Sequence, residues 1–307
     1  MKTMPCPVCG SQAEFKAHAI VAPWISRLLE EKNLYSELYS CPKCTLGFFS
    51  YRYSKIEAQK LYSSYRTGVY LKVRHSWEPW YGAAENNAYQ PQVNQNNIDS
   101  RISLMENAFE LAGIKRSFKG CVDFGGDLGQ FFPSNVEGTK YLVDLSAKPG
   151  INQDFTVVNS LSEISESVEL VMNCGVLEHM STLHGIIDEL SGTLRGGGVI
   201  YLEVPLDSFK TSRLHKSKFY KKYLKVVSRN KLIFVTFDFI TGVARQICRT
   251  IPWFGIVKQS EHINYFNNQS LQTLCSDFSG KSWISKPDYS HKQGKFKLGR
   301  IAAVLSR

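Results

Sequence analysis

The sequence predicts an α/β protein with a doubly wound, mostly parallel sheet and a small cysteine-bearing module ahead of it. Two observations carry this prediction. Short apolar runs alternate with helical patterns across residues 96–207, and two matched cysteine pairs lie within residues 1–50. The 307 residues are 43% hydrophobic and 21% charged, which suits one large globular domain with a small appendage.

Changes in composition divide the chain into parts. Residues 1–50 hold the cysteine pairs, and residues 51–95 are rich in Tyr, Trp and Asn. We expect this aromatic-rich stretch to be either a packed connector or a lid. Residues 96–307 form the main domain, and within it residues 208–258 form a basic insertion.

The alternation that predicts the sheet is clearest between residues 96 and 207. Apolar residues recur at spacings of three and four from Ile98 to Ala112, which indicates one face of a helix. A second helix is expected from about Ser181 to Leu194, where three consecutive glycines follow. Apolar runs predict strands at 120–124, 140–144, 168–173 and 199–204.

The cysteine pairs have the spacing of a metal site. Cys6-Pro7-Val8-Cys9 is matched by Cys41-Pro42-Lys43-Cys44, and each tight turn lets two thiolates reach one ion. The 31 residues between the pairs exceed the usual ribbon spacing and are expected to hold a helix around Ile25–Lys32. Four thiolates leave no open coordination position. The pattern therefore predicts a zinc ribbon whose Zn²⁺ is structural, held by Cys6, Cys9, Cys41 and Cys44.

A glycine-rich turn follows the first predicted strand of the main domain. The run from Asp123 to Gly129 reads DFGGDLG, and glycines there let the backbone approach a ligand closely. A helix is expected to start directly after the turn and to add its dipole. Asp144 ends the next strand 21 residues after Asp123, where an acid grips ribose hydroxyls. Together these features indicate an adenosine-bearing cofactor.

Several motifs resemble a known family. The run from Asp123 to Gly129 resembles the D-x-G-x-G-x-G signature of class I S-adenosylmethionine-dependent methyltransferases, which have a Rossmann-like fold. The block Asn173–His179, read NCGVLEH, is similar to the V-L-E-H of many small-molecule methyltransferases. Leu194–Gly198 with Glu203–Pro205, and the later EHINYF at Glu261–Phe266, are also similar to family segments. The resemblance covers about residues 96–307, and the cysteine pairs ahead of it resemble those of sugar C-methyltransferases.

The resemblance implies S-adenosylmethionine as the methyl donor and assigns roles to particular residues. Asp127 departs from the family pattern, which usually has its middle glycine there. His262 is the candidate proton acceptor because histidine titrates near neutral pH, and Glu261 either orients it or acts itself. A packing role for His262 stays open. Cofactor binding is assigned to Asp123, Gly125, Gly126, Asp127, Gly129, Asp144, Cys174, Glu178 and His179.

The net charge of +10 is concentrated in one segment. Residues 208–258 hold twelve Lys and Arg but a single acid, Asp238, and the remainder is close to neutral. Lys218, Lys222, Lys225 and Arg229 share one helical stripe, which predicts an amphipathic basic helix. Three roles remain open for this helix: a solvated cover, a clamp for a phosphate-bearing substrate, and a contact with the membrane surface.

The expected function is methylation of a small molecule, either a nucleotide-linked sugar or a surface-polysaccharide precursor, on carbon or oxygen. One alternative is an RNA base methyltransferase, but Asn173–Val176 lacks the N-P-P-Y type of motif used for base amino groups. Another alternative is a non-catalytic binding module on the same fold. The start Met1–Cys6 has no apolar signal core, and the longest apolar run, Leu232–Val243, is too short to span a bilayer. A cytoplasmic location is therefore expected.

Overall fold

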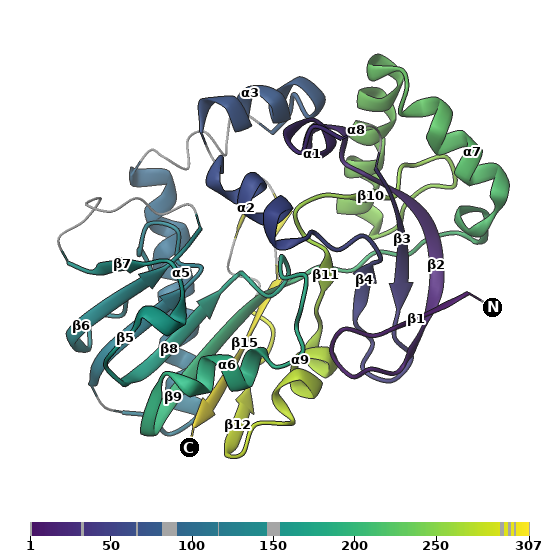
Figure 1. Ribbon diagram of the computed structural model, residues 1–307. Helices are drawn as coiled ribbons and strands as arrows, with labels where there is room; N and C mark the ends of the chain where they lie inside the picture. The colour runs from purple at the N-terminus through teal and green to yellow at the C-terminus, as the bar shows by residue number, and fades with distance from the viewer. Residues whose placement is uncertain are drawn as a thin grey trace. The chain divides into compact units, whose positions relative to one another are not determined.

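A computed structural model gives the fold, and its described residues form two compact units (Figure 1). The first unit comprises Met1–Cys6, Gly10–Tyr89 and Asp207–Tyr265. The second comprises Pro7–Cys9, Gln90–Leu206 and Phe266–Arg307. The structure describes residues 2–31, 34–65, 67–81, 91–115, 117–145, 154–288, 292–293, 296–297 and 299–306.

The second unit is built on a sheet that has seven strands in the part of the chain that the structure describes, in the order β12-β15-β9-β8-β5-β6-β7. The strands from β9 to β7 are parallel, whereas β15 is antiparallel to both of its neighbours, β9 and β12. The doubly wound, mostly parallel fold class is thus confirmed. The strands are β5 (Phe118–Phe124), β6 (Val136–Val143), β7 (Thr156–Val158), β8 (Val168–Cys174), β9 (Leu194–Leu206), β12 (Lys281–Ile284) and β15 (Gly299–Ser306). A separate pair, β13 (Lys292–Gln293) and β14 (Phe296–Lys297), is antiparallel.

Helices cover both faces of this sheet. In Figure 1, α5 (Pro91–Leu111) lies behind the strands and α6 (Ile186–Gly192) in front. Met172 of β8 and Tyr201 of β9 form one core with α5. Their neighbours Val171 and Ile200 are also fully buried, because successive side chains of a strand point to opposite faces. A third helix, α9 (Asn268–Cys275), precedes β12, and the short 3-10 turn η2 (Leu161–Glu163) precedes β8.

The connection from β5 to β6 differs from the expectation. Residues 125–131 form turns, and β6 begins at Val136 after only eleven connecting residues. The prediction of a helix directly after the glycine turn is therefore wrong. Asp127 and Gly129 have positive φ, which a right-handed helix does not contain, and Pro133 disfavours the helical conformation of the residue before it.

The first unit contains a second sheet, with β1-β2-β3-β4-β11 in order and β10 beside β2. The strands are β1 (Thr3–Pro5), β2 (Gln12–Val21), β3 (Tyr35–Ser40), β4 (Gly47–Phe49), β10 (Lys258–Gln259) and β11 (Asn264–Tyr265). The helical elements are α1 (Pro23–Leu28), α2 (Lys55–Ser63), α3 (Gly68–Trp77), η3 (Arg213–Lys216), α7 (Lys218–Val227) and α8 (Lys231–Cys248). The helix expected around Ile25–Lys32 is α1, which starts earlier because Pro23 occupies its first turn.

Three segments that the sequence analysis treats separately lie in this one unit: residues 1–50 apart from Pro7–Cys9, the described connector residues as far as Tyr81, and the basic insertion 208–258. Trp24 of α1, Tyr70 of α3 and Phe234 of α8 share its buried core. The basic insertion therefore packs with the cysteine-bearing module. Residues 82–90 of the connector lie outside the described residues.

A chain of buried charges runs through the first unit. Lys258 Nζ lies 2.5 Å from carboxylate oxygens of both Glu78 and Asp238. Arg74 contacts the other Glu78 oxygen at 3.0 Å through Nε, and Glu261 at 2.8 Å through Nη1. Burial opposes the charged form of Glu78, but Lys258 and Arg74 lower its pKa to about 2. These pairs connect α3, α8 and the strand β10 through residues far apart in the sequence.

The longest helix of this unit, α8, has 18 residues, and its middle residue Asp238 is buried and ion-paired. Among the described residues, no helix combines the length and the apolar character that crossing a bilayer requires.

We expect Lys258→Met to lower the free energy of unfolding of the first unit by about 3–5 kcal/mol, because Asp238 and Glu78 would keep buried charges without their shared cation. Urea denaturation measures the change. Adding Asp238→Leu should restore part of the loss. Lys222→Met, at an exposed lysine, is the matched control and should change stability by less than about 0.5 kcal/mol. Equal stability of Lys258→Met and the control would contradict the role of the charge chain.

Candidate functional site

The two cysteine turns have the same backbone geometry. In each, the N–H of the first cysteine donates to the residue five positions on, Ser11 or Leu46, at 2.9 Å. The residue four positions on, Gly10 or Thr45, is left-handed and donates its N–H back to the first cysteine. One turn joins β1 to β2 and the other joins β3 to β4, so the pairing of β2 with β3 brings the turns together.

The four cysteine sulfurs form a compact donor set. The Sγ atoms of Cys6, Cys9, Cys41 and Cys44 all lie within 4.8 Å of one another. Cys6 Sγ and Cys44 Sγ are 3.5 Å apart, and this contact, together with burial, raises the pKa of Cys44. A divalent cation would reverse this effect, since thiolates are the ligands that zinc prefers and four of them complete a tetrahedron. The donor set therefore fits a closed, structural zinc site.

The glycine turn after β5 has an alternating backbone. Gly125, Asp127 and Gly129 have φ of 76°, 53° and 69°, which is the left-handed region. Asp127 stands at the position where a glycine was expected, and aspartate is one of the few non-glycine residues that tolerate this conformation. The departure from the glycine pattern therefore preserves the shape of the turn.

The turn also has no room for larger side chains. A Cβ atom added at Gly125 would lie 2.3 Å from a Val176 methyl carbon, and one added at Gly126 would lie 2.3 Å from the Asp123 carboxylate. The backbone is thus packed directly over Asp123 and against the segment that follows β8. Gly125 is thus required by close packing and by its backbone angle, and Gly126 by close packing alone.

Three strand ends of the second unit converge at this turn. Phe124 of β5 is level with Val143 of β6, and Asp123 is level with Met172 of β8. Asp144, which directly follows β6, accepts a 2.8 Å hydrogen bond from the N–H of Asp127. The sequence predicts both acids and the glycines for this edge, and in the described structure they lie together there.

Asp123 is a fully buried carboxylate whose two oxygens have no hydrogen-bond partner among the described residues. Burial raises its pKa to about 7, and the charges of Asp144 and Asp127 add to the effect, whereas Arg101 opposes it. A buried charge without a partner is costly. The carboxylate therefore fits a site where a ligand supplies donors or a positive charge.

The segment after β8 supplies further polar groups. Cys174 ends the strand, and burial raises the pKa of its thiol. Glu178 is buried, its Oε2 has no hydrogen-bond partner in the described part of the chain, and burial raises its pKa. His179 Nε2 lies 3.9 Å from Glu178 Oε1. Left-handed Gly175 turns the backbone at the strand end, so these side chains lie just beyond the carboxyl edge.

A buried ion triad beside this edge was not expected from the sequence. Glu203 of β9 lies 2.8 Å from Arg101 of α5 and 2.5 Å from Arg300 of β15. The Arg101 guanidinium also lies over the Phe131 ring, 3.8 Å from its centroid. Arg101 lies in an amphipathic helical pattern and Arg300 in a C-terminal strand, so only the fold brings them together. Of the three residues, only Glu203 could have been singled out from the sequence, because it is an acid within an apolar strand.

Glu261 and His262 belong to the first unit. The Glu261 carboxylate accepts hydrogen bonds from the Tyr70 hydroxyl and from Arg74, and it is buried. His262 is partly exposed and lies between β10 and β11. The carboxylate beside the histidine is therefore held within the charge chain.

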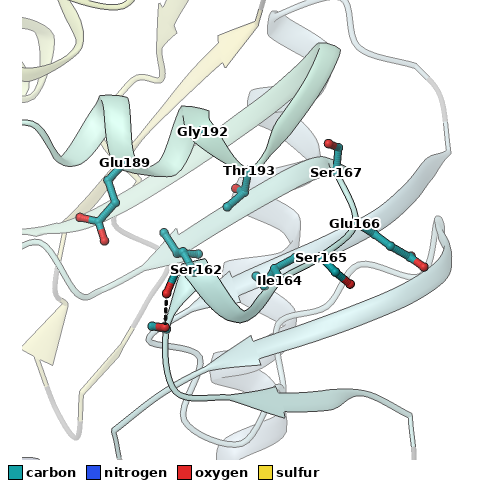
Figure 2. A pocket seen from close by; sticks show the side chains of 10 residues that line it. Ser162, Ile164, Ser165, Glu166, Ser167, Glu189, Gly192 and Thr193 are labelled. Carbon is teal, nitrogen blue, oxygen red and sulfur yellow. Dashed lines mark hydrogen bonds between the residues drawn. The ribbon is translucent and has the colours of Figure 1, made fainter.

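A cavity of about 420 Å³ lies elsewhere on the second unit (Figure 2). It is lined by residues 160–162 and 164–167, and by Glu189, Gly192 and Thr193 in and just after α6. This region precedes β8, whereas the glycine turn follows β5, so the cavity opens at the opposite end of the parallel strands. None of the predicted cofactor residues lines it.

Comparison with known proteins bears on this arrangement. The family model for the methyltransferase domain matches residues 99–278, more than half of the chain. No curated protein matches the chain. Solved structures that are similar to the chain include three methyltransferases. A Thermotoga maritima SAM-dependent methyltransferase, described as a possible histamine N-methyltransferase, has 13% identity and a TM-score of 0.39, with 76% of this chain and 98% of that chain covered. Synechocystis PCC 6803 magnesium protoporphyrin IX methyltransferase with bound SAM has 11% identity and a TM-score of 0.40, with 80% of this chain and 95% of that chain covered. Burkholderia thailandensis 1,6-didemethyltoxoflavin-N1-methyltransferase has 10% identity and a TM-score of 0.44, with 89% of this chain and 95% of that chain covered.

The cysteine cluster predicts about one zinc ion per chain. Cys41→Ser should remove most of the metal, because three thiolates hold zinc less tightly than four. Elemental analysis of the purified protein measures the content. Cys248→Ser is the matched control, since Cys248 is exposed and lies outside the cluster. Zinc content that is the same in both variants would rule out this site.

Proposed function

The chain belongs to this methyltransferase family and is an S-adenosylmethionine-dependent enzyme; from that premise we propose that it methylates a small molecule, namely a nucleotide-linked sugar or a surface-polysaccharide precursor. The observation that carries the donor part of the proposal is the set of strand-end acids around the glycine turn. We further propose that it works in the cytoplasm, and that one structural zinc ion is held by the four cysteines.

Donor binding is assigned to the carboxyl edge of the parallel strands. When bound, S-adenosylmethionine supplies a methyl group already activated on a sulfonium. Asp144 directly follows β6 and suits the ribose hydroxyls. Among the described residues, neither oxygen of Asp123 nor Oε2 of Glu178 has a hydrogen-bond partner. The tight packing of Gly125 and Gly126 leaves backbone rather than side chain at the turn surface. These features support assigning Asp123, Gly125, Gly126, Asp127, Gly129, Asp144, Cys174, Glu178 and His179 to the donor.

Methylating a hydroxyl group, or a carbon next to a carbonyl, requires a proton acceptor. We assign this role to His262. Glu261 is better suited to fix the backbone beside His262, because its two carboxylate oxygens already accept hydrogen bonds from Tyr70 and Arg74. Glu261 is accordingly a positioning residue rather than the base.

The choice of acceptor is supported by the sequence. The cysteine pairs resemble those of sugar C-methyltransferases, whose acceptors are sugars carried on a phosphate-bearing group. Incubation with labelled S-adenosylmethionine and fractionated cell extract tests it. The label should appear in a phosphate-bearing sugar fraction. Label in RNA instead would favour a base methyltransferase.

Donor affinity should depend on pH through Asp123. Its pKa of about 7 means that the carboxylate becomes protonated as pH falls below neutrality, and a protonated carboxyl cannot attract the ammonium group of the donor. The dissociation constant should therefore rise by up to about tenfold per pH unit below pH 7. Calorimetry between pH 5.5 and pH 8.5, a range of about three units around that pKa, measures it.

Asp123→Asn should remove this pH dependence. Asp144→Asn is the matched control: it keeps an oxygen for the Asp127 N–H, should weaken binding by about 1.5–3 kcal/mol, and should retain the pH dependence. A wild-type affinity that stays constant across the range would exclude Asp123 from the donor site.

His262→Ala should lower kcat by about 10²–10⁴-fold, the usual effect of losing a general base, while donor affinity stays unchanged. The wild-type pH–rate profile should contain one ionisation near neutrality that the variant lacks. His75→Ala, at an exposed histidine of α3, is the control. Normal turnover in His262→Ala, or a loss of donor binding, would contradict the assignment.

A further inference from the structure

The exposed charge of residues 208–258 has one sign. Two of the twelve basic residues are paired in the interior, Arg245 with Asp207 and Lys258 with Asp238 and Glu78. Asp238, the single acid, is buried. The ten other basic residues are all exposed, so this surface presents bases without acids of its own. They are Lys210, Arg213, Lys216, Lys218, Lys221, Lys222, Lys225, Arg229, Lys231 and Arg249.

The same segment exposes apolar side chains. Of the seventeen large hydrophobic side chains exposed among the described residues, ten lie in residues 208–258. They are Leu214, Phe219, Val226, Leu232, Ile233, Phe239, Ile240, Val243, Ile247 and Trp253. Exposed apolar residues scattered singly are normal, but a concentration of this kind indicates an interaction site. We call these ten, with the ten exposed bases, the basic–apolar surface.

The apolar residues of α8 lie along one side of the helix. At 3.6 residues per turn, its six exposed apolar residues from Leu232 to Ile247 fall within about one third of the circumference. The buried residues Phe234, Asp238 and Thr241 lie on the opposite side. Asp238 is paired with Lys258, so the orientation of the helix is fixed and its apolar side remains exposed.

Helix α7 adds the charge beside it. α7 and α8 are in contact, with the Tyr223 and Phe237 rings 6.2 Å apart between centroids. The exposed side of α7 carries the predicted lysine stripe, bordered by Phe219 and Val226. The Tyr223 hydroxyl is bonded to the Phe254 carbonyl, which holds the loop carrying exposed Trp253 against α7.

We propose that the basic–apolar surface docks on an anionic phospholipid bilayer. Lysine and arginine attract anionic headgroups, while leucine, isoleucine, phenylalanine and tryptophan side chains enter the boundary between headgroups and acyl chains. Helices that lie in this boundary combine one apolar face with a basic one, as α7 and α8 do together. The helices lie on the surface and do not cross the bilayer.

The charge of the surface separates this occupant from two others. A second copy of the chain would bring ten bases against ten bases across the interface, and like charges there are strongly unfavourable. A phosphate-bearing small molecule would use the bases but would leave the apolar stripe of α8 in water. A bilayer of anionic lipids satisfies both halves of the surface.

Vesicle co-sedimentation of the full-length protein tests the proposal. The protein should bind vesicles of phosphatidylglycerol and phosphatidylcholine, and binding should weaken with salt. Vesicles of phosphatidylcholine alone should bind at least tenfold less. Reversing Lys218, Lys222 and Lys225 to Glu should lower binding at least tenfold, and changing Leu232, Val243 and Ile247 to Ser should do so independently. An unchanged melting temperature shows that each variant is folded.

Matched controls use exposed residues elsewhere. Lys115, Lys281 and Lys286 reversed to Glu make the same change in net charge, and Ile56 and Val69 changed to Ser remove exposed apolar side chains of the first unit. Both controls should bind like the wild type. Absence of binding to anionic vesicles would overturn the proposal, as would a serine variant that binds normally. Self-association without lipid that the serine variant abolishes would assign the surface to a second copy instead. Vesicle binding requires no methyl transfer, so its outcome is independent of the acceptor.

Discussion

The parallel direction of β7, β6, β5, β8 and β9 is the constraint on which the candidate donor site depends. Because parallel strands end at one edge, Asp123, Asp144 and Cys174 meet there although Cys174 lies 51 positions after Asp123 in the sequence. The left-handed positions Gly125 and Gly129 then fold the chain back over the edge. Carboxylates held in such a place lose water, and for Asp123 this moves the pKa into the physiological range.

The first unit depends on a different kind of interaction. Its buried acids and bases alternate from Asp238 through Lys258, Glu78 and Arg74 to Glu261. Ion pairs of this sort add little net stability over apolar packing, but they penalise any arrangement that leaves one charge alone. The same series of ion pairs holds α8 with its apolar side outward, and through Glu261 it also holds the peptide that carries His262. The orientation of the basic–apolar surface and the position of the proposed proton acceptor thus rest on shared contacts.

Local patterns in the sequence predicted what short-range chemistry determines. Apolar runs predict four of the five parallel strands, β5, β6, β8 and β9, but not the three-residue β7. The matched C-x-x-C turns predict the cysteine cluster, and the spacing of Asp123 and Asp144 predicts two acids at one edge. The glycine pattern predicts a helix directly after the turn, but the structure has none there. Pro133 is the feature of the sequence that argues against this helix. The partners of Glu203 and of Lys258 come from elements far along the chain, and no local pattern specifies such pairs.

Amide hydrogen exchange tests most directly whether the donor binds at the glycine turn and the strand ends beside it. Peptides that cover Gly125–Gly129 and Cys174–His179 are followed with and without saturating S-adenosylhomocysteine, the demethylated form of the donor. The account predicts slower amide exchange in both segments and little change at residues 160–167, where the separate cavity lies. Unchanged exchange at the glycine turn, with slower exchange at another part of the chain, would contradict it.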